Sequence, residues 1–275
     1  MASVGLAPLS RVFFRQLSLS GFVANLLAIP LVTQVIVPLA LLGIVLPPLW
    51  VPASLLVQAL VQGLQWLAGL PFGLWTAAAA PAWGMALGLL GGALLLLPLP
   101  WRLRLLGLPL LLPLLAPPVQ RPAAGQFEVV VADIGQGTAV LLRIRNHLLV
   151  YDAGPRYSVE ADAAQRVLLP LLRARGEGRI DLLVLSHRDI DHVAGAASLL
   201  AQLPVVAMAS SLPQTHPLRA VGTTPWRCSA GQSWDWDGVH FELLLPLDGD
   251  YLLSARPNAL SCVLRVQGRA GAACC

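Results

Sequence analysis

The sequence predicts a multi-pass α-helical membrane segment followed by an α/β domain. No Asp or Glu occurs before Glu128, and no charged side chain of any kind occurs from Gln16 to Trp101. Lipid is the simplest solvent for so long an uncharged apolar run. Beyond residue 118 the pattern changes to short β-type runs separated by turn residues. We therefore expect a membrane segment at 1–118, a linker at 119–126 and an α/β domain at 127–275.

The membrane segment is expected to contain about three spans. The first runs from about Leu17 to Leu46, and Pro30 and Pro38 are expected to kink it. A Gly/Ala-rich span at about 74–99 and a Leu/Pro-rich span at about 105–118 follow. Kinked spans that carry polar side chains favour a bundle of helices over a plain anchor.

A further helix, "SLLVQALVQGLQWLAG", differs from the spans because it carries a polar stripe. Gln58, Gln62 and Gln65 stand at positions i, i+4 and i+7 and so share one narrow face. Two interpretations remain open. The helix lies in the membrane interface or lines a cavity, or its glutamines only bond to a neighbouring helix.

Arginines at the ends of the apolar segments predict the orientation in a plasma membrane. The positive-inside rule places Arg11, Arg15, Arg102 and Arg104 in the cytoplasm, so the last span delivers residue 119 onward to the extracytoplasmic side. The net charge of +4 comes from this part of the chain and is better explained by topology than by binding to nucleic acid. A cleaved signal peptide is a poor alternative because the apolar character continues far beyond such a peptide.

The α/β domain is expected to begin with three consecutive strands, and a buried strand "IDLLVLS" leads into a polar loop. The expected strands lie at 127–132, 138–144, 147–151, 180–186, 204–209, 238–245 and 260–266, and the expected helices at about 160–175 and 193–202.

The polar loop holds the densest cluster of candidate metal ligands, which are His187, Asp189, Asp191 and His192. A turn from a strand into a helix lets residues at i, i+2, i+4 and i+5 converge on one small volume. Two imidazoles and two carboxylates suit Zn²⁺, Mn²⁺ or iron better than Ca²⁺ or Mg²⁺. A metal ion would lower the pKa of bound water and so supply hydroxide. The alternative is that the two Asp residues cap a helix and His187 is a satisfied core residue.

This loop resembles that of the metallo-β-lactamase superfamily, which reads His-x-His-x-Asp-His after a strand. The order "SLSGFVANLLAIPLVTQVIVPLALLG", "ADIGQGTAVLL", "YDAGP", "LSHRDIDHVAG", "AGQSWDWDGVHFELLLP" and "NALSCVLRV" resembles the ComEC-type DNA internalization competence proteins. The resemblance implies a membrane competence segment joined to an αββα metallo-β-lactamase-like domain that is incomplete at its C-terminus.

The resemblance also implies a function and a set of roles. It implies an inner-membrane channel that passes one strand of DNA into the cytoplasm, with an extracytoplasmic nuclease-like domain that degrades the other. The expected partners are DNA, membrane lipid and other competence-machinery proteins. His187, Asp191 and His192 would be metal ligands, and Asp191 would also orient the attacking water. Asp189 stands where the wider superfamily has its second His, which makes Mn²⁺ at least as plausible as Zn²⁺ for the one or two divalent ions.

Other residues have weaker implied roles. Asp152 in "YDAG" would be a carboxylate that supports the ligands, and Asp133 and Gln136 in "DIGQG" lie on the facing strand end or only form a turn. A two-metal site in this superfamily needs a later Gly-Asp and a further His, and neither His216 nor His240 matches. The chain ends where those elements should begin. We therefore expect a metal-dependent DNA hydrolase in the complete protein, and weak metal binding with little turnover from this chain.

Two other functions remain open. The chain is a membrane-anchored metallohydrolase of another substrate class without a transport role, or it is a DNA-handling module that has lost its chemistry. The placement outside the cytoplasm would allow Cys228 and Cys262 to form a disulfide, and unpaired buried thiols are the alternative.

Three tryptophans and four arginines raise the question of direct DNA contact. Trp226, Trp234 and Trp236 could stack on bases, although packing in the core or at a strand edge is the more common use. The arginines at 166, 173, 175 and 179 could touch phosphates, but an ordinary solvated helix face explains them better.

Overall fold

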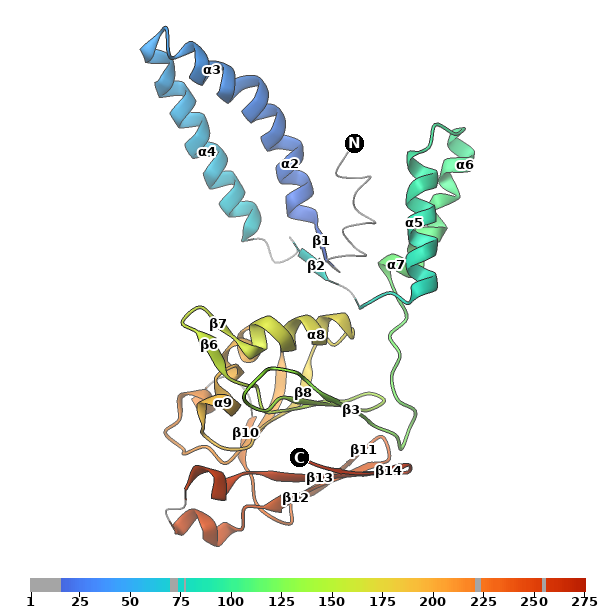
Figure 1. The fold of residues 1–275 in the computed structure, drawn as a ribbon, viewed down its shortest axis with the longest axis vertical. Helices are drawn as coiled ribbons and strands as arrows, with labels where there is room; N and C mark the ends of the chain where they lie inside the picture. The colour runs from blue at the N-terminus through green and yellow to red at the C-terminus, as the bar shows by residue number, and fades with distance from the viewer. Residues whose placement is uncertain (1–15, 70–73, 77, 221–223, 254–255) are drawn as a thin grey trace. The chain divides into compact units, whose positions relative to one another are not determined.

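The computed structural model describes residues 16–69, 74–76, 78–220, 224–253 and 256–275 (Figure 1). The chain divides into two compact units, Met1–Pro118 and Val119–Cys275. Arg11 and Arg15, on which the predicted orientation partly depends, lie outside the described residues.

The first unit contains two helical stretches whose length and apolar composition suit a membrane span. Within the described residues these are Ser20–Leu42 and Pro47–Ala68. The first comprises α2 (Leu19–Leu31), the π-helical turns of η1 (Val32–Ile36) and α3 (Val37–Leu42), and the second comprises η2 (Pro47–Leu49) and α4 (Trp50–Ala68). The π-helical turns begin two residues after Pro30, whose missing N–H breaks the ordinary α-helical hydrogen-bond ladder.

The glutamine-bearing helix and the later apolar segments differ from the expectations. Gln58, Gln62 and Gln65 are all exposed on α4, which is long enough to span as well as to lie in an interface. The expected span at 74–99 is interrupted, because β2 (Leu74–Thr76) pairs with β1 (Gln16–Ser18) and Pro81 holds an extended backbone before the next helix. That helix, α5 (Ala82–Leu96), has 15 residues, and α7 (Gly107–Leu115) has nine. Both are shorter than the roughly 20 residues that a span needs.

The helices α5 and α7 pack closely through glycines. Gly84, Gly88 and Gly91 on α5 are buried. A Cβ atom added at Gly91 would lie 2.6 Å from the carbonyl oxygen of Gly107 on α7. Such close backbone contact is how helices pack in lipid, where no hydrophobic effect drives them together. The short helix α6 (Trp101–Leu105) carries the two arginines between them.

The second unit is built on two sheets. The first sheet has the strand order β10-β9-β8-β5-β4-β3, antiparallel among β3, β4 and β5 and parallel from β5 to β10. Its strands are β3 (Glu128–Val131), β4 (Val140–Arg143), β5 (Leu148–Tyr151), β8 (Ile180–Leu185), β9 (Val205–Ser210) and β10 (Thr224–Arg227). The second sheet is antiparallel and comprises β11 (Ser233–Trp236), β12 (Val239–Leu245), β13 (Val263–Gly268) and β14 (Gly271–Cys274).

Helices cover one face of the first sheet and the second sheet covers the other (Figure 1). The buried strand β8 shows why. Its Leu183 and Leu185 point into the core beneath the helices, whereas Leu182 and Val184 point into the core between the sheets, where they join Phe241. Alternate side chains of a strand face opposite sides, so a strand that is apolar throughout needs cover on both. Each fully buried leucine contributes about 1.5–3 kcal/mol.

The predicted strands of the α/β domain are found within a few residues of their expected bounds, whereas the predicted helices are broken up. The helix expected at 160–175 is preceded by a hairpin of β6 (Arg156–Ser158) and β7 (Ala161–Asp162) and consists of η3 (Ala164–Leu168) and α8 (Leu169–Ala174). The helix expected at 193–202 is two helices, α9 (Ile190–Val193) and α10 (Ala196–Gln202). The turns η4 (Pro217–Ala220), η5 (Asp248–Leu252) and η6 (Pro257–Leu260) were not predicted.

The expected linker at 119–126 is docked on the second unit. Arg121 pairs with the buried carboxylate of Glu177, which also accepts a hydrogen bond of 2.8 Å from Nε of the buried Arg143. Pairing of this kind is what makes buried charge tolerable. At the other end of the linker, Gly125 N donates to the Asp237 carbonyl oxygen at 2.7 Å.

Candidate metal centre

The candidate ligands lie where β8 ends and α9 begins. Asp189 occupies the position before α9 with an extended backbone, and its side chain makes no capping hydrogen bond to the helix. Its carboxylate oxygen instead lies 3.4 Å from His187 Nε2. Asp191, in the first turn, has an oxygen 3.6 Å from His192 Nε2. Helix capping therefore does not account for Asp189.

The two imidazole rings lie together, with centroids 4.1 Å apart. Nδ1 of His192 is 2.7 Å from an Asp152 oxygen, and a carboxylate can only accept, so this nitrogen carries the hydrogen. Ser186 Oγ donates its one proton to Asp152 at 2.7 Å and therefore accepts from His187 Nδ1 at 2.9 Å. In its neutral form, each ring therefore presents the Nε2 lone pair toward a carboxylate of the loop.

Asp152 anchors this arrangement. It is fully buried and accepts three hydrogen bonds of 2.7 Å, from Ser186 N, Ser186 Oγ and His192 Nδ1. Its φ of 58° is in the left-handed region, an uncommon conformation that asparagine and aspartate tolerate better than most residues. These contacts place Asp152 against His192 and Ser186, and its role as a support for metal ligands stays a prediction.

The same contacts shift the two histidines in opposite directions. The hydrogen bond to Asp152 raises the pKa of His192. Burial, followed by the nearby His192, lowers the pKa of His187. His187 is therefore held as the neutral imidazole, which is the form that binds a metal ion.

The donor chemistry fits a divalent transition metal, but the side chains converge only in pairs. The separations of 3.4 and 3.6 Å are longer than a good hydrogen bond. They are close to the distance between two ligand atoms that bind the same metal ion, each at about 2.1 Å from it. Across the ranges that the structure describes, no three His, Cys, Asp or Glu side chains converge closely enough to hold a metal ion.

The other predicted candidates lie elsewhere. Asp133 is exposed and accepts a long hydrogen bond of 3.4 Å from Gly135 N, which fits the turn role. Gln136 is exposed in the same turn. His216 Nδ1 accepts from Leu218 N, and His240 pairs with an exposed Asp235, so neither joins the loop cluster.

Sequence reasoning missed two serines and two glycines at the site. Ser186 bridges Asp152 to the histidines, and Ser261 Oγ lies 3.3 Å from His187 Nδ1. A Cβ atom at Gly137 would lie 2.4 Å from the Asp191 carbonyl oxygen, and one at Gly195 would lie 2.3 Å from that of Ala153. The glycines of "DIGQG" and "HVAG" were the available signal, since close backbone approach is a common reason for glycine.

The histidines open into a cavity of about 320 Å³, here called the His cleft. Val129 and Val131 of β3 line one side, and Cys274 and Cys275 belong to the same lining. The buried base of the cleft is formed by Asp152, Ser186 and His187. A mixed wall of this kind, apolar with a few convergent polar groups, is typical of a binding site.

The fold and the cleft agree with the comparisons of this chain with known families. Residues 132–254 match the metallo-beta-lactamase superfamily, and residues 1–102 match the family described as Competence protein. The second unit therefore has the metallo-β-lactamase fold, and it follows a competence-protein segment.

Individual relatives agree with these matches. The chain is 37% identical over 260 residues to the competence protein ComA of Neisseria gonorrhoeae, covering 92% of this chain and 34% of ComA. It is 32% identical over 142 residues to recombination protein 2 of Haemophilus influenzae, covering 51% of this chain and 17% of that protein. It is 29% identical to the uncharacterized protein YcaI of Escherichia coli, covering 95% of this chain and 34% of YcaI. The resemblance to ComEC-type competence proteins is confirmed, and the chain spans about a third of the length of ComA and YcaI.

Proposed function

We propose that this chain forms part of an inner-membrane channel for the uptake of single-stranded DNA, with a nuclease-like domain on the extracytoplasmic side. The observation that carries the proposal is the order of the two matched regions, a competence-protein segment followed by a metallo-β-lactamase domain. The likeness to ComA along 92% of this chain supports the same order in one polypeptide.

The His cleft would serve as the hydrolytic site. His187, Asp189, Asp191 and His192 would hold one or two divalent ions, Mn²⁺ or Zn²⁺, and a bound ion supplies a water of lowered pKa. Asp152 and Ser186 fix both rings with Nε2 turned toward the carboxylates. Asp191 would orient the attacking water, and the burial of His187 limits its contact with bulk water.

Two observations support the membrane location and its sidedness. Ser20–Leu42 and Pro47–Ala68 are long and apolar enough to span. Cys228 and Cys262 form a disulfide that is fully buried in the second unit. Disulfides persist in oxidising compartments and are rare in the cytoplasm, so the bond favours an extracytoplasmic second unit. Other competence-machinery proteins are the expected partners.

A hybrid protein tests the proposal. The segment of N. gonorrhoeae ComA that aligns with this chain is replaced by this chain, in a transformable host that lacks its own ComA. Uptake of labelled double-stranded DNA into the cytoplasm and degradation of the complementary strand are then measured separately. We expect the hybrid to restore uptake, and Asp191→Asn to abolish degradation of the complementary strand. Asp235→Asn, on the exposed edge of β11, is the matched control.

The outcomes separate the parts of the proposal. A hybrid that reaches the membrane but takes up no DNA would contradict the transport role. Unchanged degradation in the Asp191→Asn hybrid would contradict the hydrolytic role of the His cleft. Calorimetric titration of the purified chain with Mn²⁺ and Zn²⁺, compared with His192→Asn, tests metal binding without depending on turnover.

A further inference from the structure

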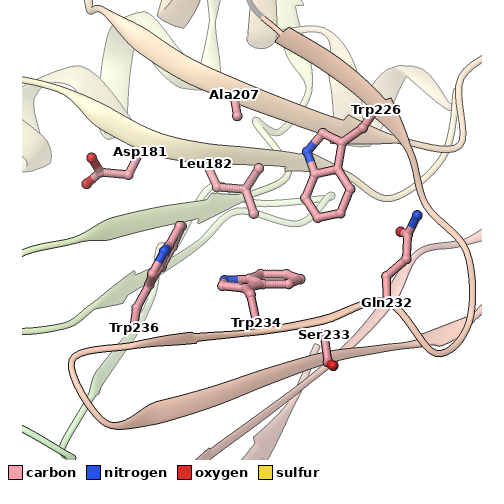
Figure 2. A pocket seen from close by; sticks show the side chains of 8 residues that line it. All are labelled: Asp181, Leu182, Ala207, Trp226, Gln232, Ser233, Trp234 and Trp236. Atoms are coloured by element: carbon pink, nitrogen blue, oxygen red, sulfur yellow. The ribbon is translucent and has the colours of Figure 1, made fainter.

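A second cavity, of about 440 Å³, lies at the edge of the second unit where the two sheets face each other (Figure 2). We call it the Trp pocket because Trp226, Trp234 and Trp236 line it, together with Leu182 and Ala207 of the first sheet. Its volume is within the roughly 300–1,000 Å³ of small-molecule sites. Among the described residues, those that line the Trp pocket do not line the His cleft, so the two sites are distinct.

The strands bring the three indoles together from both sheets. Trp226 comes from β10, the edge strand of the first sheet, and Trp234 and Trp236 come from β11, an edge strand of the second. Trp234 and Trp236 are two residues apart on one strand and therefore point to the same face. Figure 2 shows Trp234 lying flat along one side of the cavity, with Trp226 and Leu182 across from it.

The three indole rings pack against neighbouring aromatic side chains in the absence of a ligand. Trp234 stacks on the fully buried Phe241 with centroids 5.3 Å apart and an interplanar angle of 5°. Trp226 meets Trp234 edge-on at 5.5 Å, and Trp236 stacks on His147 at 4.7 Å. Aromatic side chains fixed by packing lose little further freedom when a ligand binds, which favours affinity.

Packing alone does not explain a tryptophan at position 234. Its indole Nε1 is buried and has no hydrogen-bond partner within the described part of the chain. A phenylalanine would bury a similar apolar face on Phe241 without leaving a donor unpaired, which costs free energy. A large flat surface at this position therefore points to use as a platform.

An arginine, Arg179, pairs with one of the residues that line the pocket. Asp181 lines it, and one of its carboxylate oxygens accepts from Leu148 N at 2.8 Å, which fixes the side chain. The other oxygen is 3.0 Å from the Arg179 guanidinium, whose side chain is 62% exposed. A residue that lines the Trp pocket thus holds a solvent-accessible guanidinium through its carboxylate.

We propose that the Trp pocket binds a base of single-stranded DNA, with Arg179 contacting the neighbouring phosphate. A flat π-face joined to an anion is the ligand that matches three indoles and one guanidinium, because stacking platforms beside cations are how proteins hold single strands without reading sequence. An acyl chain would gain nothing from the guanidinium. The inference rests on the DNA-handling role proposed above, and it assigns the strand a contact outside the His cleft.

Binding of two oligonucleotides to the full chain in detergent tests the inference. One is a short fluorescein-labelled oligothymidylate, and the other is an abasic oligonucleotide of the same length, so that they differ only in their bases. Anisotropy is measured in EDTA, which removes hydrolysis from the experiment. We expect the wild-type chain to bind the oligothymidylate about tenfold more tightly than the abasic strand. Trp226→Ala should remove this preference, and Trp226→Phe should largely keep it.

Two further variants separate the phosphate contact from general charge. Arg179→Gln should weaken binding of both oligonucleotides and reduce the salt dependence of log Kd by about 0.7. Arg173→Gln, on α8, is the matched control for loss of charge and should leave the salt dependence unchanged. Trp66→Ala, on α4, is the matched control for loss of an indole and should leave the preference for bases unchanged.

Each result supports or overturns the inference. Equal binding of both oligonucleotides by the wild-type chain would overturn the Trp pocket as a base site and leave the uptake proposal standing. A preference that survives Trp226→Ala would overturn it as well. A base preference in a chain whose hybrid fails in DNA uptake would support the Trp pocket and contradict the proposed function. Absence of any DNA binding would overturn both.

Discussion

Breaking the Cys228–Cys262 disulfide is expected to cost the second unit about 4 kcal/mol of stability. The bond closes a loop with a sequence separation of 34 residues, and the loop-closure entropy removed from the unfolded chain by such a loop corresponds to about 4 kcal/mol at 25 °C. In a unit of this size, 1 kcal/mol shifts the melting temperature by about 2–4 °C. The melting temperature should therefore fall by about 8–16 °C.

The assay compares oxidised and reduced wild-type chain in the same detergent. Melting of the second unit is followed by its resistance to protease during heating, and the Cys228→Ala/Cys262→Ala variant serves as a second route to the same state. Cys274→Ser, at an exposed free cysteine, is the control for removal of a thiol. A shift of no more than about 2 °C on reduction would refute the reasoning, since it would leave less than about 1 kcal/mol for the bond.

Two further changes have definite expected results. Gly137→Ala should cost about 1–3 kcal/mol of stability and weaken Mn²⁺ binding, because the φ of Gly137 is 135° and the added Cβ would meet the Asp191 carbonyl oxygen. Gly135→Ala is the control, since Gly135 also has a positive φ but open space around it. Equal melting temperatures and equal Mn²⁺ affinities for the two variants would contradict the contact. Burial opposes ionisation of Asp237, but hydrogen bonds from residues 146–147 outweigh it and lower the pKa below 3.8. The ionised group therefore stabilises the fold above pH 3.8, and the contribution is lost as the pH falls through the lowered pKa. Asp237→Asn should reduce the fall in the free energy of unfolding between about pH 5 and 3. If the free energy of unfolding of the variant falls with pH as steeply as that of the wild type, the stabilising role of ionised Asp237 is contradicted.

The strands and the ligand loop could be predicted from the sequence because their signals are local. The run at 180–185 is apolar throughout, which already indicates a strand covered on both faces, and the cluster after it is dense enough to stand out. The sequence left the pairing of Cys228 and Cys262 open, with unpaired buried thiols as the alternative, and the structure shows the bond.

Other features depend on contacts between distant residues and had no local signal. Asp189 has the sequence context of a helix cap, and only the folded loop shows its carboxylate beside His187. The role of Ser186 follows from Asp152, 34 residues earlier, which takes the serine proton and so decides which nitrogen of His187 is free. The helix α5 is short because it begins only after Pro81, whose backbone is extended. The apolar pattern at 74–99 did not predict this interruption.

The disulfide also connects stability to the His cleft. Cys262 N donates to the Ser186 carbonyl oxygen at 2.9 Å, and the Cys262 carbonyl oxygen accepts from Tyr151 OH at 2.6 Å. The bonded cysteine thus fixes the start of β13 against the end of β8, and the preceding Ser261 reaches His187 Nδ1 from that position. These contacts thus link the disulfide to the orientation of the ring whose Nε2 faces Asp189.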